Sequence, residues 1–157
     1  MTVQTYFAYG SNLHKAQMKR RCPDSVPLER LSIKNWKLVF RGVADIVPQP
    51  DSILNGALYR VSPKDIAALD RYEGIKSGLY RRITFKIAGA GTAFAYVMND
   101  DDVALPTMDY YRIIWEGYSN WGIRKDSLKK ALRETAEDLV PGLLKPVLRD
   151  YAAAVSL

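Results

Sequence analysis

The amino-acid sequence predicts one α+β domain, residues 1–157, with helices grouped around an antiparallel sheet or small barrel. Three observations support this prediction. Segments with the alternation and the β-branched and aromatic content of strands dominate roughly the first hundred residues. Segments with helical periodicity dominate the rest. No repeat, low-complexity tract or domain linker divides the chain, and its 157 residues suit one domain with a proper core.

The first two predicted elements are a strand and a helix joined by a tight turn. Residues 2–9, "TVQTYFAY", are typical of a strand, which Gly10 and Ser11 then interrupt. Asn12 is the predicted N-cap of a helix over residues 13–22. Pro23 ends that helix, because proline cannot continue one.

The next predicted elements are strands. Residues 28–42 indicate two short strands or one bent strand with half-buried apolar positions. Residues 43–52 contain Pro48 and Pro50, so they should form a sheet edge or a loop. An Asn-Gly turn signal at positions 55 and 56 predicts a new strand after it.

A short amphipathic helix should follow this strand. Ser62 is the predicted N-cap, and Pro63 occupies the first helical position. Ile66 and Leu69, three residues apart, give the helix a buried side. Gly74 is the expected end of the helix.

The remaining elements are a hairpin and two helices. Residues 79–87 and 92–99 are β-rich and flank "AGAG", so they predict a hairpin. Residues 108–121 have helical period, with Gly122 ending the helix. Asp126 should cap a second amphipathic helix, which the Pro-Gly pair at 141–142 stops.

Composition excludes several kinds of protein. No apolar run approaches the roughly 20 residues that span a bilayer, and the N-terminus lacks the features of a secretory signal. The single cysteine, Cys22, excludes an internal disulfide and fits a cytoplasmic location. One histidine and one cysteine make a metal site or cofactor unexpected. His14 is interpreted as a solvent-facing helix residue, and it lies eight positions from Cys22, too far for a catalytic pair on one helix.

The net charge of +6 favours anionic partners in general. The basic residues are scattered, and no RNA-recognition signature or zinc finger accompanies them, so nucleic acid is not the expected partner. Aromatic surface on the helix at 108–121 belongs either to the core or to a homodimer contact.

Two stretches are candidates for chemistry. In "YFAYGSNL", residues 6–13, Gly10 lets backbone approach a ligand, and the amides that follow suit a carboxylate or phosphate. The alternative is a plain strand-to-helix connector. In "LDRYEGIKSGLYRR", residues 69–82, Glu73 lies at a helix C-terminus among aromatics. Both the helix dipole and desolvation raise a carboxyl pKa in such a place, which suits a proton acceptor near neutral pH. The alternative is a solvated glutamate in a turn.

Taken together, these stretches resemble the γ-glutamylcyclotransferases and their plant AIG2-like relatives. "YFAYGSNL" is similar to the family's substrate loop, and "LDRYEGIKSGLY" is similar to the segment that carries its catalytic glutamate. "VADIVPQPDSILNGALYRVS", "FAYVMND" and "YYRIIWEG" resemble further family segments in the same order. The likeness runs from about Tyr6 to Gly117 and is loose beyond that point.

The resemblance implies a small, mostly antiparallel β-barrel with surrounding helices and a cavity at one end. It also implies a cofactor-free and metal-free reaction, in which a γ-glutamyl amide cyclises to 5-oxoproline and releases an amine or amino acid. By position, Glu73 is the implied catalytic residue. The implied substrate-binding residues are Tyr6, Phe7, Ala8, Tyr9, Gly10, Ser11, Asn12, Tyr80 and Tyr96.

The resemblance leaves the acceptor half of the substrate open. Relatives of this kind act on γ-glutamyl amino acids, on γ-glutamylamines, or on γ-glutamyl groups that protect a biosynthetic intermediate. A binding protein that kept the fold without the chemistry is the alternative of another class. Glu73 argues against it, because such a protein has no need of that carboxylate.

Overall fold

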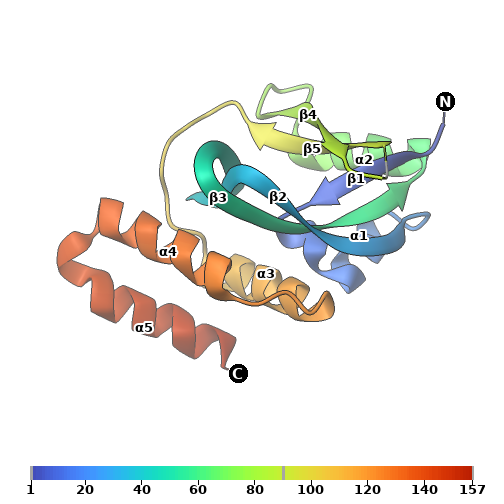
Figure 1. Cartoon of the computed structure of the whole chain (residues 1–157). Helices are drawn as coiled ribbons and strands as arrows, with labels where there is room; N and C mark the ends of the chain where they lie inside the picture. The colour runs from blue at the N-terminus through green and yellow to red at the C-terminus, as the bar shows by residue number, and fades with distance from the viewer. Residues whose placement is uncertain (1, 90, 157) are drawn as a thin grey trace.

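The computed structural model describes residues 2–89 and 91–156. Five strands fill most of the first hundred residues, and three of the five α-helices follow them (Figure 1). The order along the chain is β1 (Gln4–Ala8), η1 (Ser11–Leu13), α1 (Lys15–Arg21), β2 (Val26–Arg41), β3 (Val43–Val61), α2 (Pro63–Glu73), β4 (Tyr80–Ile87), β5 (Gly91–Met98), α3 (Met108–Asn120), α4 (Asp126–Leu139), η2 (Pro141–Leu143) and α5 (Leu144–Val155), where η marks a 3-10 helix.

The strands form one mixed sheet in the order β2-β3-β1-β5-β4. Most pairings are antiparallel, but β1 runs parallel to β5, with Tyr6 opposite Phe94. The α+β prediction is therefore confirmed. The predicted barrel is not, because β2 and β4 lie at the two edges of an open sheet in the described part of the chain.

Strand β1 crosses the middle of the sheet, and its successive side chains face opposite sides. Phe7 packs edge-on against Phe85 and lies directly over the backbone of Gly56. A Cβ atom at Gly56 would lie 2.4 Å from the Phe7 ring and from the Ala8 carbonyl oxygen. Asn55 and Gly56 are thus not a turn, as their sequence suggested, but part of β3 where close approach to β1 requires glycine.

Strands β2 and β3 are two long, bent strands of a hairpin (Figure 1). The pairing shifts register between Lys34 and Trp36, where Asn35 has a φ of 68°. Pro48 lies in β3 opposite Trp36, in a stretch whose other edge β1 does not reach. The predicted edge is confirmed, since a proline without an N–H is tolerated where one side of the strand is unpaired.

Helix α2 follows its sequence prediction closely. The Ser62 side chain accepts the Asp65 amide, and the Asp65 carboxylate accepts the Ser62 amide, which forms a complete capping box. Ile66 and Leu69 are buried. Gly74 ends the helix at a φ of 67°, a left-handed conformation that favours glycine.

The start of α1 differs from its prediction. Asn12 is not the N-cap; it lies in η1, and α1 begins at Lys15. His14 is the N-cap, and its Nδ1 accepts the Gln17 amide. Its Nε2 therefore carries the proton and lies 2.9 Å from the Glu116 carboxylate of α3. The prediction of a solvent-facing His14 is wrong, because this half-buried ring joins α1 to α3.

Helices α3, α4 and α5 pack together on one side of the sheet (Figure 1). Tyr111, Ile114 and Tyr118, which follow the helical period of the sequence, are buried, and Trp115 of the same stripe is half-buried. Lys125 rather than Asp126 precedes α4, and its side chain makes no capping bond. The third of these helices, α5, was not expected from the sequence. No described helix is both long and apolar enough to span a membrane.

Candidate functional site

A cavity of about 230 Å³ opens where the loop after β1 meets the end of α2. Its walls come from segments far apart in the sequence, namely β1 with the loop and η1 that follow it, the start of β3, the end of α2 and its connection to β4, the start of β4, β5 and α3. Tyrosine is the commonest residue type among them. The lining residues are Tyr6, Tyr9, Gly10, Ser11, Asn12, Val43, Ala44, Tyr72, Glu73, Leu79, Tyr80, Tyr96 and Tyr110.

The turn at Gly10 brings backbone to the cavity wall. A Cβ atom there would lie 3.0 Å from the Ala44 Cβ, so glycine lets the turn pack closely against β3. The amides of Leu13 and His14 bond within η1. Those of Ser11 and Asn12 precede them, and the first amides of a helix have no partner within it. These two amides are the ones suited to an anionic ligand.

Not all of the predicted loop residues reach the cavity. Tyr6, Tyr9, Gly10, Ser11 and Asn12 line it. Phe7 and Ala8 lie outside the lining set. Both are fully buried, Phe7 against Phe85 and Ala8 opposite Ala57 of β3. Their placement is that of core residues.

Glu73 is the last residue of α2 and the carboxylate of the cavity lining. Burial among the tyrosines raises its pKa to about 7. The Arg21 guanidinium opposes this effect and lowers the pKa of Glu73. At neutral pH the carboxyl group is therefore divided between its two protonation states, so it can both accept and return a proton.

The hydroxyl groups of Tyr9 and Tyr96 donate to the protein. Tyr9 Oη donates to the Tyr96 carbonyl oxygen at 2.6 Å, and Tyr96 Oη donates to Asp70 Oδ1 at 2.7 Å. Asp70 in turn pairs with Arg82 of β4. Burial raises the pKa of Tyr96 above its ordinary value, so its hydroxyl stays neutral. Tyr96 thus lines the cavity with its ring while Asp70 holds its hydroxyl.

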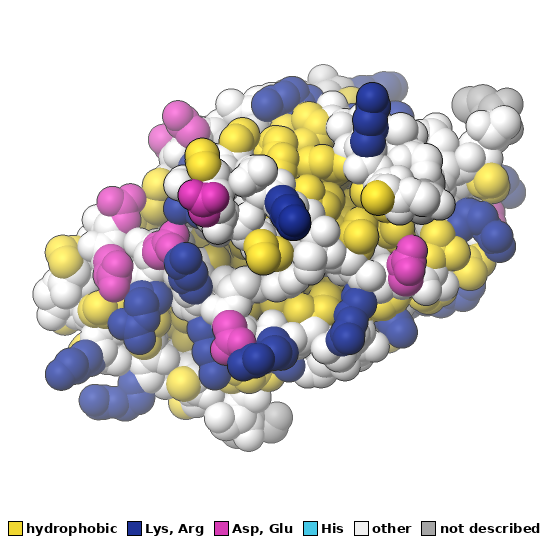
Figure 2. Space-filling model, viewed as in Figure 1, with side chains coloured by type: hydrophobic (Ala, Val, Ile, Leu, Met, Phe, Trp, Pro, Cys, Tyr) yellow, Lys and Arg dark blue, Asp and Glu magenta, His cyan; other side chains and the backbone are white. Residues whose placement is uncertain are grey.

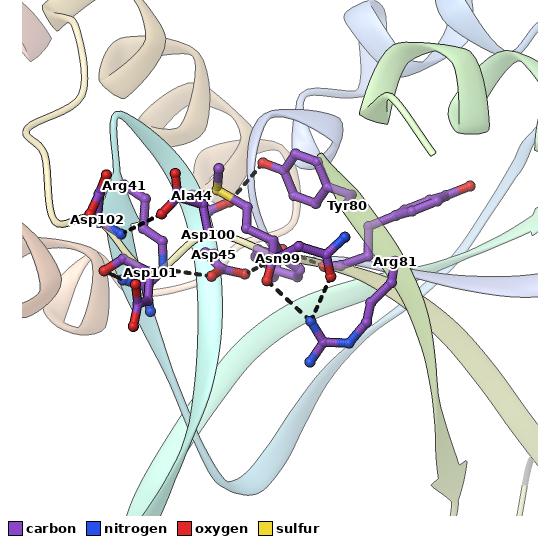
Figure 3. Close-up of polar contacts among 12 residues, drawn as sticks. Arg41, Ala44, Asp45, Tyr80, Arg81, Asn99, Asp100, Asp101 and Asp102 are labelled. Atoms are coloured by element: carbon purple, nitrogen blue, oxygen red, sulfur yellow. Dashed lines mark hydrogen bonds and ion pairs between the residues drawn. The ribbon is translucent and has the colours of Figure 1, made fainter. Parts of the chain in front are cut away.

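A polar network supports the wall formed by β3 and β4 (Figure 3). Tyr80 Oη lies 3.4 Å from the Ala44 carbonyl oxygen. The neighbouring Asp45 is buried, where it accepts the Met98 amide at 2.9 Å and pairs with Arg41 at 2.8 Å. Figure 3 also shows Arg81 turned toward Asn99, its hydrogen-bond partner, and away from Tyr80. The network fixes the position of Ala44 without adding an unpaired charge to the cavity.

Five cavity residues were missed from the sequence, namely Val43, Ala44, Tyr72, Leu79 and Tyr110, and only the two tyrosines left a signal there. Tyr72 directly precedes Glu73. Tyr110 lies one position before Tyr111, the first residue of the buried stripe of α3, so core packing alone does not explain an aromatic residue there. Its hydroxyl accepts the Ala44 amide at 3.0 Å. Val43, Ala44 and Leu79 carry no signal beyond their neighbours. Leu79 and Tyr72 are about half exposed.

The described residues offer little for a metal. Their only cluster of three candidate ligands is Asp100, Asp101 and Asp102, which are all exposed and lie beside Arg41 (Figure 3). The basic residues do not form a stripe on the face shown in Figure 2, where they are spread among acidic and apolar side chains. Cys22 is fully buried, and burial raises the pKa of its thiol to about 12, which makes it a poor nucleophile.

Comparisons with known proteins agree on one family. The sequence profile described as "Gamma-glutamyl cyclotransferase, AIG2-like" matches residues 6–116. Among curated proteins, the chain is 29% identical to the gamma-glutamylcyclotransferase of Mus musculus over 141 residues, which cover 80% of this chain and 75% of the mouse protein. It is 29% identical to that of Homo sapiens over 134 residues, which cover 75% and 71% of the two chains.

A solved structure shows the same architecture. The chain superimposes on a gamma-glutamyl cyclotransferase with a TM-score of 0.73 and 27% identity. The match covers 82% of this chain and 86% of the other.

Proposed function

Because the chain belongs to the γ-glutamyl cyclotransferase, AIG2-like family and is an enzyme of that type, we propose that it converts a γ-glutamyl amide into 5-oxoproline and a free amine or amino acid. One observation carries the mechanism. Glu73, a carboxyl group with a pKa of about 7, lies in a tyrosine-walled cavity that Gly10, Ser11 and Asn12 of a tight turn also line.

The two charged groups of the glutamyl end match the two sides of this cavity. The α-carboxylate binds the amides of Ser11 and Asn12, which present positive partial charge without adding a side chain. The α-ammonium group faces Glu73. The tyrosine rings exclude water and hold the flexible glutamyl chain folded.

The reaction needs one base that also serves as an acid. Glu73 takes a proton from the α-ammonium group, and the free amine attacks the γ-carbonyl carbon. The tetrahedral intermediate then collapses, the amide C–N bond breaks, and Glu73 returns the proton to the leaving nitrogen. The ring nitrogen still carries two protons, and it releases one of them to Glu73, from which that proton passes to the released amine. Attack within one molecule closes a five-membered ring. Holding the chain for attack supplies up to about 7–11 kcal/mol in the best-oriented systems.

The rate should depend on pH through Glu73. The base must be deprotonated, and burial raises its pKa to about 7. We therefore expect kcat/KM to rise with pH through about 7 and to level off above it. The measurement is initial rates of 5-oxoproline formation from pH 5 to 9 at low substrate concentration. A profile flat between pH 5 and 8 would contradict the role of Glu73 as the base.

Tyr96→Phe should have a modest effect. The hydroxyl donates its hydrogen to Asp70, so its removal frees the Asp70–Arg82 pair and loosens the wall. We expect KM to increase several-fold and kcat to change less than about threefold. Steady-state kinetics measure both. The control is Tyr59→Phe, a buried tyrosine outside the cavity whose hydroxyl lacks a partner among the described residues. A large kcat loss with unchanged KM would place the Tyr96 hydroxyl in the chemical step.

The proposal is tested by incubating the protein with a panel of γ-glutamyl compounds and detecting 5-oxoproline by mass spectrometry. The panel contains γ-glutamyl-alanine, γ-glutamyl-ε-lysine and glutathione, because the glutamyl half is common to all three and the acceptor half differs. Product from wild type and none from Glu73→Gln supports the reaction. The ranking of the three substrates identifies the acceptor class. No 5-oxoproline from any of them would count against the proposed activity.

A further inference from the structure

The hydroxyl groups that line the cavity differ in what they can offer a substrate. Those of Tyr9 and Tyr96 donate to protein oxygens, and that of Tyr80 faces the Ala44 carbonyl. The Tyr6 hydroxyl has the opposite role, because its oxygen accepts a hydrogen bond from Asn12 Nδ2 at 2.9 Å. A hydroxyl whose oxygen is held as an acceptor keeps its hydrogen for another partner.

Tyr6 and Glu73 line the same cavity. The negative charge of Glu73 is the largest contribution to the raised pKa of Tyr6 after burial. Tyr110 is the other cavity tyrosine that accepts a protein hydrogen bond, but it faces the Ala44 amide and the Ser11 side chain. Glu73 acts on the pKa of Tyr110 as well, but the Tyr110 hydroxyl has two protein partners and the Tyr6 hydroxyl has Asn12 alone among the described residues, so Tyr6 is the better donor to a substrate.

A relay fixes this hydroxyl from behind. Arg21, the last residue of α1, donates from Nη1 to Asn12 Oδ1, and Asn12 Nδ2 donates a hydrogen bond to the Tyr6 hydroxyl oxygen. The Arg21 guanidinium lies 3.4 Å from the centroid of the Tyr72 ring. No carboxylate among the described residues forms an ion pair with Arg21. Its positive charge therefore acts on Tyr6 through Asn12 and on Glu73 across the cavity.

Resting on the cyclotransferase reaction proposed above, we infer that the Tyr6 hydroxyl donates to the oxygen of the γ-carbonyl as it becomes an oxyanion, and that Arg21 and Asn12 are its positioning residues. Asn12 orients the hydroxyl by accepting from Arg21 and donating to Tyr6. The positive charge of Arg21 polarises the hydrogen bonds that run through Asn12 to Tyr6, so the Tyr6 hydroxyl is a stronger donor to the developing oxyanion. As the oxyanion collapses, the negative charge leaves the oxygen and Tyr6 keeps its proton.

The same arrangement gives Arg21 an effect on the base. The charged or titratable groups that act electrostatically on Glu73 or are acted on by it are Arg21 of α1, Tyr6 of β1, Tyr9, Tyr80 of β4 and Tyr110 of α3. The pKa of each of these tyrosines is raised by burial, so all four stay neutral near pH 7. Arg21 is thus the cation that lowers the pKa of Glu73.

The test is a double-mutant cycle with Tyr6→Phe and Arg21→Met. Tyr6→Phe should reduce kcat about 100-fold with little change in KM, the usual effect of removing one oxyanion donor. Arg21→Met should reduce kcat about 10-fold and move the rise of kcat/KM to higher pH, because the cation that lowers the Glu73 pKa is gone. The double variant should be no more than about threefold slower than Tyr6→Phe, because the hydroxyl that Arg21 and Asn12 position is already absent. Arg21→Lys, which keeps the charge, should retain the wild-type pH profile.

The control is Arg20→Met, which removes the neighbouring, exposed arginine of the same helix and should leave kcat and the pH profile unchanged. Losses that multiply in the double variant would overturn the relay, and so would an unshifted pH profile in Arg21→Met. A titration of the Glu73 carboxyl carbon by NMR, in wild type and Arg21→Met, separates this inference from the activity itself. Wild type without 5-oxoproline formation overturns the proposed function and with it the role of Tyr6. An unchanged Glu73 pKa in Arg21→Met overturns the role of Arg21.

Discussion

Glu73→Gln is expected to reduce kcat by at least about 1,000-fold, within the range that a positioned general acid–base group contributes. Glutamine has nearly the same shape as glutamate, so it fills the same space at the end of α2. It cannot accept the proton of the α-ammonium group, and the amine then remains protonated and unable to attack. The measurement is 5-oxoproline formation at pH 8, where wild-type Glu73 is mostly ionised.

The stability of the same variant gives an independent check. The native protein keeps a proton on Glu73 up to about pH 7, whereas an ordinary carboxyl group releases it near 4.5. Between these values the unfolded chain binds fewer protons, so stability falls as pH rises. Glu73→Gln removes this loss, and we expect it to be at least as stable as wild type above pH 7 in urea unfolding.

Glu137→Gln is the matched control, because Glu137 is an exposed residue of α4. It should keep wild-type turnover. Turnover retained in a well-folded Glu73→Gln would refute the mechanism. Lower stability of Glu73→Gln at pH 8 would instead show that the native protein holds the charged carboxylate favourably.

Phe7→Ala is expected to cost about 3–5 kcal/mol in the free energy of unfolding, the usual range for a buried phenylalanine. Phe7 has no exposed surface and packs against Phe85 and the backbone of Gly56. Its removal leaves a cavity that β1 and β3 cannot close, because their hydrogen bonds fix their separation. Urea unfolding measures the loss.

The contrast with Tyr6 makes this prediction specific. Tyr6→Phe keeps the ring and should cost little stability while it reduces kcat. Phe7→Ala, measured in protein that remains folded at low temperature, should leave KM close to wild type. A Phe7→Ala protein of normal stability with a greatly increased KM would place Phe7 in the substrate site, as the sequence resemblance implied.

The sequence was most informative where local chemistry decides the structure. Ser62, Pro63 and Gly74 set the limits of α2 through capping and a left-handed residue, and those limits put Glu73 at the end of the helix. The hairpin of β4 and β5 is confirmed in the same way, although residue 90 of its connection lies outside the described residues.

Predictions failed where packing between distant segments decides the structure. Asn55-Gly56 has the sequence of a turn, but β1 needs that glycine to pack Phe7. Asn12 is a residue type that often caps helices, but its side-chain amide is bonded to Tyr6 through Nδ2 and to Arg21 through Oδ1. The open sheet depends on which strands pair, which local pattern does not specify. The relay through Arg21 was likewise invisible, because its members meet only across α1, η1 and β1.

The parallel pairing of β1 with β5 has a consequence for how the protein acquires activity. Tyr9 and Tyr96 meet across the cavity although they are 87 residues apart in the chain. Because β1 near the N-terminus pairs with β5, the contacts between them join residues far apart in the sequence, and such contacts form slowly. During synthesis the loop that we propose to bind the substrate leaves the ribosome long before the cavity wall that β5 supplies. Catalytic competence should therefore appear only in the last folding phase, and a ribosome-bound chain that ends before β5 should be inactive.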